Sequence, residues 1–304
     1  MMTMIETPQA RGKLLFDASM KKYNTWGVGG NAQCIFMPKD IEDLSRFLAN
    51  LEDEIPVTWL GLGSNVLIRD GGIDGVVIVT QTGLKDIQFY DNVVHAQAGV
   101  ACAKLARSSV SKGLSGIEFM AGIPGTVGGA LAMNAGAFGG QTWPRVLSVE
   151  VINRRGDIKK RSAHEYEYGY RKVKVFNGEW FVGAKFTLDT DLDRNNVISI
   201  KELLAQRSAT QPIGKKNCGS VFMNPENEHA ARLIERCGLK GFSIGGACVS
   251  EKHANFILNE NDATADDIEK LINYVRDTVS EKCNIELHTE VRFLGNKMQK
   301  EDSV

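Results

Sequence analysis

The sequence predicts an α+β fold, and three observations lead to this prediction. Short β-rich runs alternate with helix patterns over the first two thirds of the chain, and some of these runs flank turn residues as hairpin strands do. The last third contains three helix patterns. With 304 residues, the chain is long enough for two domains, or for one large body with subdomains.

The first elements follow from local patterns. Asp40 is a suitable N-cap for a helix whose apolar residues, from Ile41 to Leu51, form one stripe. A strand signal at 57–60 enters a sharp loop, GLGSN, at 61–65. A β-rich run follows at 75–80, so two strands are expected on either side of the loop.

The middle of the chain carries hairpin signals. In each of them, strand-forming residues flank a turn, and the paired runs are 87–90 with 93–97 and 146–153 with 158–161. Between the two hairpins, a helix from about 100 to 112 should stop at Gly113, a residue suited to the left-handed position after a helix. A further strand is predicted at 180–189.

A polar segment, DTDLDRNN at 189–196, is the best domain boundary. Beyond it we expect helices at 198–206, 225–237 and 265–280, a closing strand at 286–294 and a loose tail at 298–304. Thr264 and Asp267 stand in capping-box-like positions before the last helix.

The segment from Gly113 to Gly140 contains nine glycines and a single charged residue, Glu118. Its other residues are apolar enough for burial, which distinguishes it from a flexible linker. Buried glycine-rich backbone permits close approach, positive φ and N–H groups that point at an anion. The segment therefore predicts a large phosphorylated cofactor lying on the main chain, and the alternative is a tightly turned core connection.

Other nucleotide motifs do not fit the sequence. The loop 61–65 lacks the third glycine of GxGxxG because Val66 stands there, which argues against a Rossmann site. By itself this loop fits phosphate contact and a plain turn equally well. No GKS or GKT occurs, and GFSIG at 241–245 follows a helix pattern where a nucleophile elbow would need a strand.

Composition excludes several classes of function. Charged residues make up 24% of the chain and the net charge is −1, so no nucleic-acid partner is expected. No apolar run has the length for a signal peptide or membrane insertion. The six cysteines form no CxxC pair and predict reduced thiols without a metal site. A cytoplasmic enzyme or binding protein is expected.

Four polar residues have ordinary structural interpretations when each is considered alone. Ser220 would be a turn residue, with Asn224 capping a helix that Pro225 opens. Arg171 would be a solvated surface arginine, and Glu290 an exposed carboxylate on a strand.

Taken together and in order, several segments resemble the UDP-N-acetylenolpyruvoylglucosamine reductase (MurB) family. The resemblance covers about residues 20 to 295. The segments are GLGSN from Gly61, GIEFMAGIPGTVGGALAMNAGAFGG from Gly116, Tyr170-Arg171, GSVFMNP from Gly219, LKGFSIGGACVSEKHANFILN from Leu239 and TEVRFLG from Thr289.

The resemblance implies a PCMH-type, vanillyl-alcohol-oxidase-like FAD fold. Two subdomains, 1–80 and 81–190, would hold non-covalent FAD, and a third, 195–304, would close over the substrate. Only 49 positions separate Arg171 from Ser220, an interval that resembles the second subtype of the family, which lacks a long substrate-capping loop. Val173, Met223 and Gly27 depart from the usual family pattern.

The implied reaction reduces UDP-N-acetylglucosamine enolpyruvate to UDP-N-acetylmuramate in peptidoglycan precursor synthesis, with NADPH as hydride donor and FAD as cofactor. A monomer is expected. Two other functions fit the residues: an FAD oxidase or dehydrogenase of the same fold acting on another substrate, and a sugar-nucleotide-binding protein without redox activity.

The resemblance also implies roles for particular residues. Arg171 would meet the substrate's negative charge, Ser220 would donate a proton to C2, and Glu290 would act in a protonated form that needs a raised pKa. Asn224 would contact substrate. The expected FAD contacts are Gly61, Leu62, Gly63, Ser64, Asn65, Gly122, Ile123, Pro124, Gly125, Thr126, Gly128, Gly129, Asn134 and Gly136.

Overall fold

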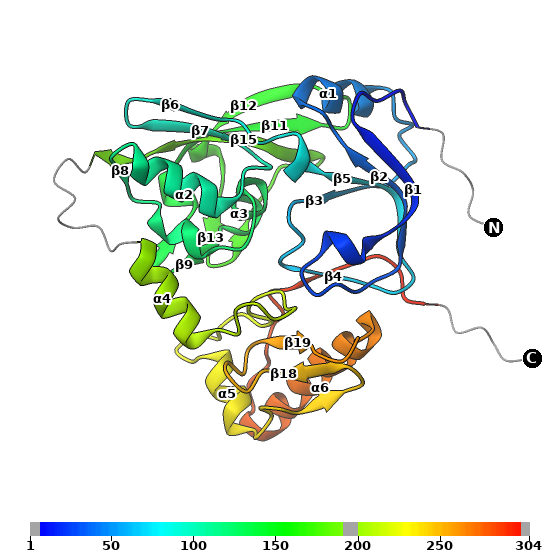
Figure 1. Cartoon of the computed structure of the whole chain (residues 1–304), viewed down its shortest axis with the longest axis vertical. Coiled ribbons are helices and arrows are strands. Elements are labelled where there is room, and N and C mark those ends of the chain that lie inside the picture. Colours follow the sequence, from blue (N-terminus) through cyan, green and yellow to red (C-terminus); the bar gives the residue numbers. More distant parts are fainter. Residues whose placement is uncertain (1–6, 191–199, 299–304) are drawn as a thin grey trace, which may run out of the picture. The chain divides into compact units, whose positions relative to one another are not determined.

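The computed structural model describes residues 7–190 and 200–298 (Figure 1). The chain divides into two compact units. The first unit comprises residues 1–15, 34–62 and 75–207, and the second comprises 16–33, 63–74 and 208–304. The expected boundary at 189–196 and the expected tail lie mainly outside the described residues. The three-part division of the chain stays a prediction.

The first elements form a four-stranded sheet in the order β1-β2-β5-β3. Its strands are β1 (Lys13–Ser19), β2 (Asn31–Met37), β3 (Val57–Leu60) and β5 (Ile73–Val79). Helix α1 (Ile41–Ala49) begins where predicted, because the Asp40 carboxylate accepts a hydrogen bond from the backbone N–H of Asp43. Phe47 of this helix stacks on Phe36, with 3.9 Å between ring centroids.

The first unit also contains a five-stranded antiparallel sheet, in the order β12-β11-β15-β7-β6. The strands are β6 (Ile87–Tyr90), β7 (Val93–Gln97), β11 (Val146–Asn153), β12 (Ile158–Ser162) and β15 (Glu179–Thr187). Both predicted hairpins are confirmed. Helix α2 (Cys102–Ser111) ends before Gly113, whose φ of 74° is left-handed as expected.

The glycine-rich segment folds on one face of this sheet, where Figure 1 shows α2 and α3. Its elements are β8 (Leu114–Ser115), α3 (Val127–Met133), β9 (Gly136–Ala137) and β10 (Gly140–Gln141). Met120, Val127 and Leu131 are fully buried, which confirms that this segment belongs to the core. Three short strands follow, β13 (Tyr168–Gly169), β14 (Lys172–Val173) and β16 (Asp189–Thr190), and then helix α4 (Ile200–Thr210).

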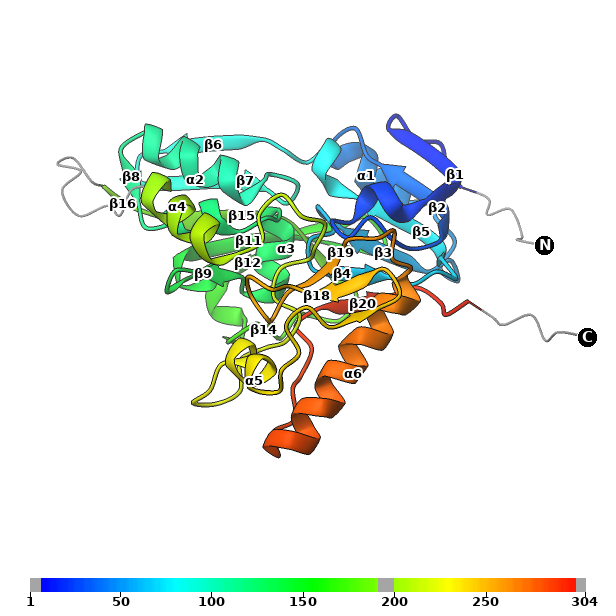
Figure 2. The same cartoon turned by 60° about the horizontal axis from the view of Figure 1, so that its bottom comes forward.

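In its described residues, the second unit contains helices α5 and α6 and two small sheets, β17-β18-β19 and β20-β4. Its elements are β4 (Val66–Ile68), α5 (Ala230–Arg236), β17 (Ser243–Ile244), β18 (Ala247–Val249), β19 (Ile257–Asn259), α6 (Ala265–Cys283) and β20 (Arg292–Leu294). Thr264 and Asp267 form the expected capping box. Helix α6 runs beside the β17-β18-β19 sheet (Figure 2), and its apolar face is buried in the core of the unit.

Two predictions for the second unit are wrong in extent. The helix expected from Pro225 begins only at Ala230, because Asn227 has a left-handed φ of 60° that interrupts a helix. The closing strand expected from residue 286 is a regular strand only at β20. Before β20, the chain pairs with another segment at a single bridge, between Thr289 and Phe222.

Candidate active site

A cavity of about 440 Å³ lies in the first unit, a volume within the usual range for ligand sites. Four predicted cofactor contacts line it: Gly61, Thr126, Gly128 and Gly129. Gly61 of the GLGSN loop and residues of the glycine-rich segment therefore meet here, although Gly61 and Thr126 are 65 positions apart in the sequence. Indole side chains of Trp59 and Trp180 also line the cavity and stack on each other, with centroids 5.2 Å apart.

Two buried polar atoms, one on each of two residues that line the cavity, lack a hydrogen-bond partner among the described residues. They are the hydroxyl oxygen Oγ1 of Thr126 and the indole nitrogen Nε1 of Trp59. Only 3% of Thr126 is exposed. Burying a polar group without a partner costs roughly 1–3 kcal/mol, so the two atoms are suited to bonding a polar ligand in the cavity.

Space is the main contribution of the glycines around this cavity. A side chain at Gly61 would overlap the Thr126 hydroxyl, and a Cβ at Gly128 would lie 2.9 Å from that of Ala98. At Gly129 a Cβ would meet only Thr126 Oγ1, at 3.8 Å. A methyl group at Gly129 therefore fits the protein, but it would take space from whatever fills the cavity.

Several N–H groups of residues 122–129 bond other parts of the protein. Among the glycines in this range none has a positive φ, in contrast to Gly63 at 70°. The N–H of Val127 donates to the Val100 carbonyl at 2.8 Å, and that of Gly128 donates to the Ala98 carbonyl at 2.8 Å. These two donors fix the start of α3 against its neighbours and are therefore not free for a ligand.

Several other predicted cofactor contacts lie outside the cavity lining. Gly122, Ile123, Pro124 and Gly125 lead into α3 and belong to the first unit, as does Leu62, whereas Gly63, Ser64 and Asn65 belong to the second unit. The Asn65 amide donates to the backbone carbonyl of Glu290 at 3.1 Å. This bond connects the end of the GLGSN loop to a predicted catalytic residue.

Arg171 lies in the turn of the β13–β14 hairpin with a left-handed φ of 53°. Its Nη2 donates to the carbonyl of Gly136 at 2.9 Å, and its side chain is partly buried, unlike that of a solvated surface arginine. The Asn134 amide supports the same hairpin, because Nδ2 donates to the Gly169 carbonyl at 2.9 Å. The glycine-rich segment thus positions Arg171 directly.

Ser220 and Glu290 come together in the second unit through backbone bonds. The N–H of Glu290 donates to the carbonyl of Val221 at 2.8 Å, next to Ser220 in the chain. Asn224 remains exposed, and its side-chain oxygen accepts from the N–H of Ala230 at 3.1 Å, in front of α5. Arg171 belongs to the first unit, so its convergence with Ser220 and Glu290 stays a prediction.

Burial shifts the pKa of one histidine and one cysteine, His253 and Cys102. His253 is partly buried, and burial lowers the pKa of its imidazole. Burial raises the pKa of the Cys102 thiol to about 12. The cysteines among the described residues are free thiols, and Cys237 and Cys283 lie 3.7 Å apart between sulfur atoms. No group of described residues could hold a metal ion.

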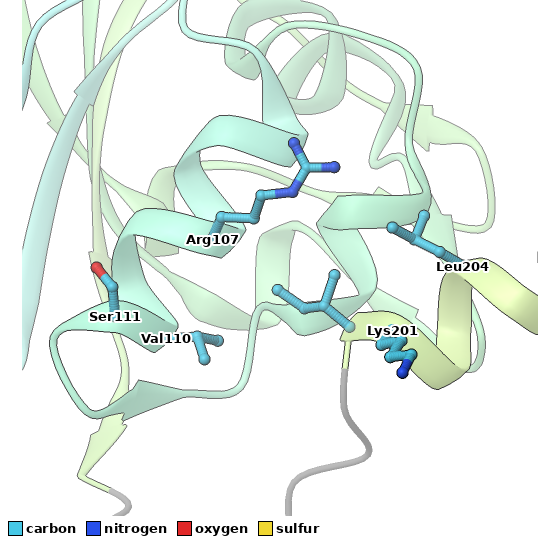
Figure 3. Close-up of a pocket in the computed structure, with 6 residues that line it drawn as sticks. Arg107, Val110, Ser111, Lys201 and Leu204 are labelled. Atoms are coloured by element: carbon cyan, nitrogen blue, oxygen red, sulfur yellow. The ribbon is translucent and has the colours of Figure 1, made fainter.

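A second hollow of about 520 Å³ lies between α2 and α4 (Figure 3). Arg107 and Val110 line it from α2, and Lys201 and Leu204 line it from α4. It contains none of the predicted site residues.

No helix in the described parts of the chain has both the length and the apolar character that a bilayer crossing requires.

Comparison with known proteins gives consistent matches. Residues 32–162 match the FAD binding domain family, and residues 211–294 match the family described as UDP-N-acetylenolpyruvoylglucosamine reductase, C-terminal domain. A protein of that reductase name from Legionella pneumophila is 52% identical over 290 residues, covering 95% of this chain and 94% of the relative. One from Alkalilimnicola ehrlichii is 49% identical, covering 93% and 95%.

A solved structure agrees with these sequence relatives. The crystal structure of UDP-N-acetylenolpyruvylglucosamine reductase (MurB) from Thermus caldophilus matches with a TM-score of 0.79 and 32% identity. The match covers 94% of this chain and 99% of that chain. The similarity therefore extends over both compact units.

Proposed function

Because the chain belongs to the UDP-N-acetylenolpyruvoylglucosamine reductase family, we infer that its two units supply, respectively, a cofactor site and a proton-transfer site for one reduction. The enzyme is an FAD-containing oxidoreductase of peptidoglycan precursor synthesis, and its fold is the α+β FAD-binding fold of this family. The roles of individual residues are our proposal.

One observation supports the cofactor site above all. The cavity in the first unit joins two glycine-rich segments around the unpartnered Thr126 hydroxyl, and its volume suits part of a dinucleotide. These residues fit FAD, with Gly61, Thr126 and Gly129 against it. When bound, FAD supplies hydride transfer from NADPH to C3 of the enolpyruvyl group.

During this reduction, residues of the chain must stabilise the negative charge that develops on the substrate and must supply a proton. Hydride addition at C3 moves negative charge toward C2 and the attached carboxylate. Arg171 suits that carboxylate, because a guanidinium stays cationic and binds carboxylates at two points. Its contact with the Gly136 carbonyl fixes the side chain for this purpose.

Ser220 donates the proton to C2 in this proposal, and Glu290 stabilises the charge as a protonated donor. A serine hydroxyl is a weak acid, so it can protonate only a strongly basic carbon centre, and it needs exact placement. The bond between the Glu290 N–H and the Val221 carbonyl supports this assignment, since it holds the two residues on adjacent backbone. Asn224 is exposed, and in this proposal it contacts the substrate.

We propose further that the enzyme works as a monomer in the cytoplasm. Free thiols are typical of a reducing compartment, and the described cysteines are unpaired. Light scattering of the purified protein would test the monomer, because a mass near twice 33.4 kDa would contradict it.

An anaerobic absorbance experiment tests the function. The purified protein should show an oxidised flavin spectrum, lose it on addition of NADPH and regain it on addition of UDP-N-acetylglucosamine enolpyruvate. Recovery with small alcohol or ketone substrates instead would favour another oxidoreductase of this fold. A folded protein that cannot be loaded with FAD would favour a sugar-nucleotide-binding protein without redox activity.

A further inference from the structure

Ser220 lies at the start of a short segment, residues 220–223, that other parts of the second unit hold from two sides. On one side, Phe222 bridges to Thr289, and the N–H of Met223 donates to the His288 carbonyl at 2.9 Å. On the other side, the N–H of Val221 donates to the backbone carbonyl of Asn255 at 2.9 Å. The segment therefore depends on residue 255 for its second set of bonds.

The side chain of Asn255 completes this attachment. Its Oδ1 accepts from the N–H of Phe222 at 3.0 Å, and its Nδ2 donates to the carbonyl of the same residue at 2.8 Å. Only 3% of Asn255 is exposed, so both bonds are shielded from water. An amide is the side-chain group that can accept and donate at once in this way, because it carries both a carbonyl and an NH₂.

The loop that carries Asn255 is itself fixed. The Ser250 hydroxyl oxygen accepts from the N–H groups of Lys252 and His253, at 3.2 and 3.3 Å. The N–H of Asn255 donates to Nδ1 of His253 at 3.3 Å, and the N–H of Phe256 donates to the His253 carbonyl at 3.0 Å. Asn255 thus attaches the 220–223 segment to a rigid support.

We propose that Asn255 is a positioning residue for proton transfer, which sets the location of Ser220 relative to Glu290 through the backbone of Val221 and Phe222. This inference rests on the proposed function. Val221 links all three, since its N–H bonds the Asn255 carbonyl and its carbonyl bonds the N–H of Glu290. A displacement of about 1 Å in a catalytic group can lower a rate by about a hundredfold, so loss of this attachment should act mainly on the step that uses Ser220.

The test is the Asn255→Asp variant of the full-length holoenzyme. The substitution keeps the shape and one acceptor, but it places a carboxylate oxygen against the Phe222 carbonyl where Nδ2 now donates. We expect the limiting rate of flavin reoxidation by saturating UDP-N-acetylglucosamine enolpyruvate to fall about 10- to 100-fold. Flavin reduction by NADPH should stay within about twofold. Both rates are read from bound flavin, so unfolded molecules contribute to neither.

Asn259→Asp is the matched control. Asn259 belongs to the same unit, is 8% exposed and bonds backbone in the same way: Nδ2 donates to the Trp26 carbonyl at 2.9 Å, and Oδ1 accepts from the N–H of Ala263 at 2.8 Å. It does not contact the 220–223 segment through these bonds. It should lower the melting temperature to a similar degree while leaving the ratio of the two rates unchanged.

Two outcomes decide the proposal. A selective loss of reoxidation in Asn255→Asp, absent from Asn259→Asp, supports it. Equal slowing of both rates, or the same ratio in the two variants, overturns it and leaves Asn255 a purely structural residue. If Asn255→Asp retains too little holoenzyme to measure, Asn255→Ser, too short to reach both Phe222 groups, replaces it under the same criteria. A wild-type enzyme whose reduced flavin the substrate cannot reoxidise would instead contradict the proposed function.

Discussion

The two units build their sites in different ways. In the first unit, three predicted glycines, the Thr126 side chain and two stacked indoles are among the groups that line a cavity, so close approach and unpartnered polar atoms characterise the site. In the second unit, backbone bonds between distant segments bring Ser220 and Glu290 together. The comparison suggests that substitutions in the cavity should change cofactor affinity, whereas substitutions around Ser220 should change the rate of one half-reaction.

Ser220→Ala should have the largest effect. Without the hydroxyl, flavin reoxidation by the substrate should slow by about 10²–10⁴, the usual contribution of general acid–base catalysis, while reduction by NADPH stays nearly unchanged. Stopped-flow absorbance times the two half-reactions separately. Ser243→Ala, in β17 of the same unit, is the control. Equal slowing of both half-reactions would assign Ser220 to folding or flavin placement.

Arg171→Lys should have the next largest effect. Lysine keeps the positive charge but loses the planar fork, so we expect reoxidation to slow about 10- to 100-fold with unchanged flavin content. Arg107→Lys replaces an exposed arginine of the same unit and should change neither property. A variant that loses flavin in proportion to activity would place Arg171 with the cofactor and not with the substrate carboxylate.

Gly129→Ala should weaken FAD binding about tenfold or more, because the added methyl group intrudes on the cavity. The apoprotein should be no less stable, since alanine is favoured over glycine in a helix by about 1 kcal/mol. Gly128→Ala provides the contrast, as its Cβ would crowd Ala98 and destabilise the fold itself. Fluorescence titration with FAD and thermal unfolding of the apoprotein measure the two effects. Unchanged FAD affinity in Gly129→Ala would show that the part of the cavity at Gly129 does not contact the cofactor.

Glu290→Gln should reduce the reoxidation rate by less than about tenfold. Glutamine keeps the shape and a donor, so it can replace a protonated carboxyl that only donates a hydrogen bond. Stopped-flow reoxidation at saturating substrate is the measurement, with Glu290→Ala as the comparison that removes the donor. A nearly inactive Gln variant would indicate that Glu290, and not Ser220, gives up the proton.

The smallest effect concerns stability alone. Asp43 is buried, which raises its pKa, but the backbone N–H groups of Lys39, Arg11 and Gly12 and the Arg11 charge lower it more, so the net pKa falls below its ordinary value. A carboxylate with a lowered pKa stabilises the fold above its unfolded pKa, and this stabilisation disappears as pH falls through the folded pKa.

Asp43→Asn should therefore destabilise the protein by about 1–3 kcal/mol at pH 7, and the difference from wild type should shrink below about pH 4. Chemical denaturation at several pH values measures this difference. Asp40→Asn is the control, because asparagine caps helices as well as aspartate does. A difference that stays constant down to pH 2 would show that ionisation of Asp43 is not the cause.

Local patterns predicted much of the fold. Strands β6 and β7 have the predicted bounds, and the Asp40 and Thr264 caps start the predicted helices. The late start of α5 was not predictable from its apolar periodicity, because the left-handed turn at Asn227 depends on its surroundings. Composition and spacing alone also did not predict catalytic roles for Ser220, Arg171 or Glu290.

The lining of the cavity was also only partly predictable from the sequence. The glycine-rich segments predicted a cofactor, and four of the residues expected to contact it line the cavity. Trp59 was not among the expected residues, because an indole in a strand has no local sign that its nitrogen will lack a partner. Asn255 was also not among the expected residues, because its two hydrogen bonds to Phe222 join residues 33 positions apart. Such contacts depend on tertiary structure.

The most direct test of the division between the two units compares Gly129→Ala and Ser220→Ala at saturating FAD. We expect flavin reoxidation by UDP-N-acetylglucosamine enolpyruvate to recover to within about twofold of wild type in Gly129→Ala, because added cofactor overcomes a loss of affinity. In Ser220→Ala it should remain slower by about 10² or more at full flavin occupancy. Recovery in both variants, or in neither, would contradict the account.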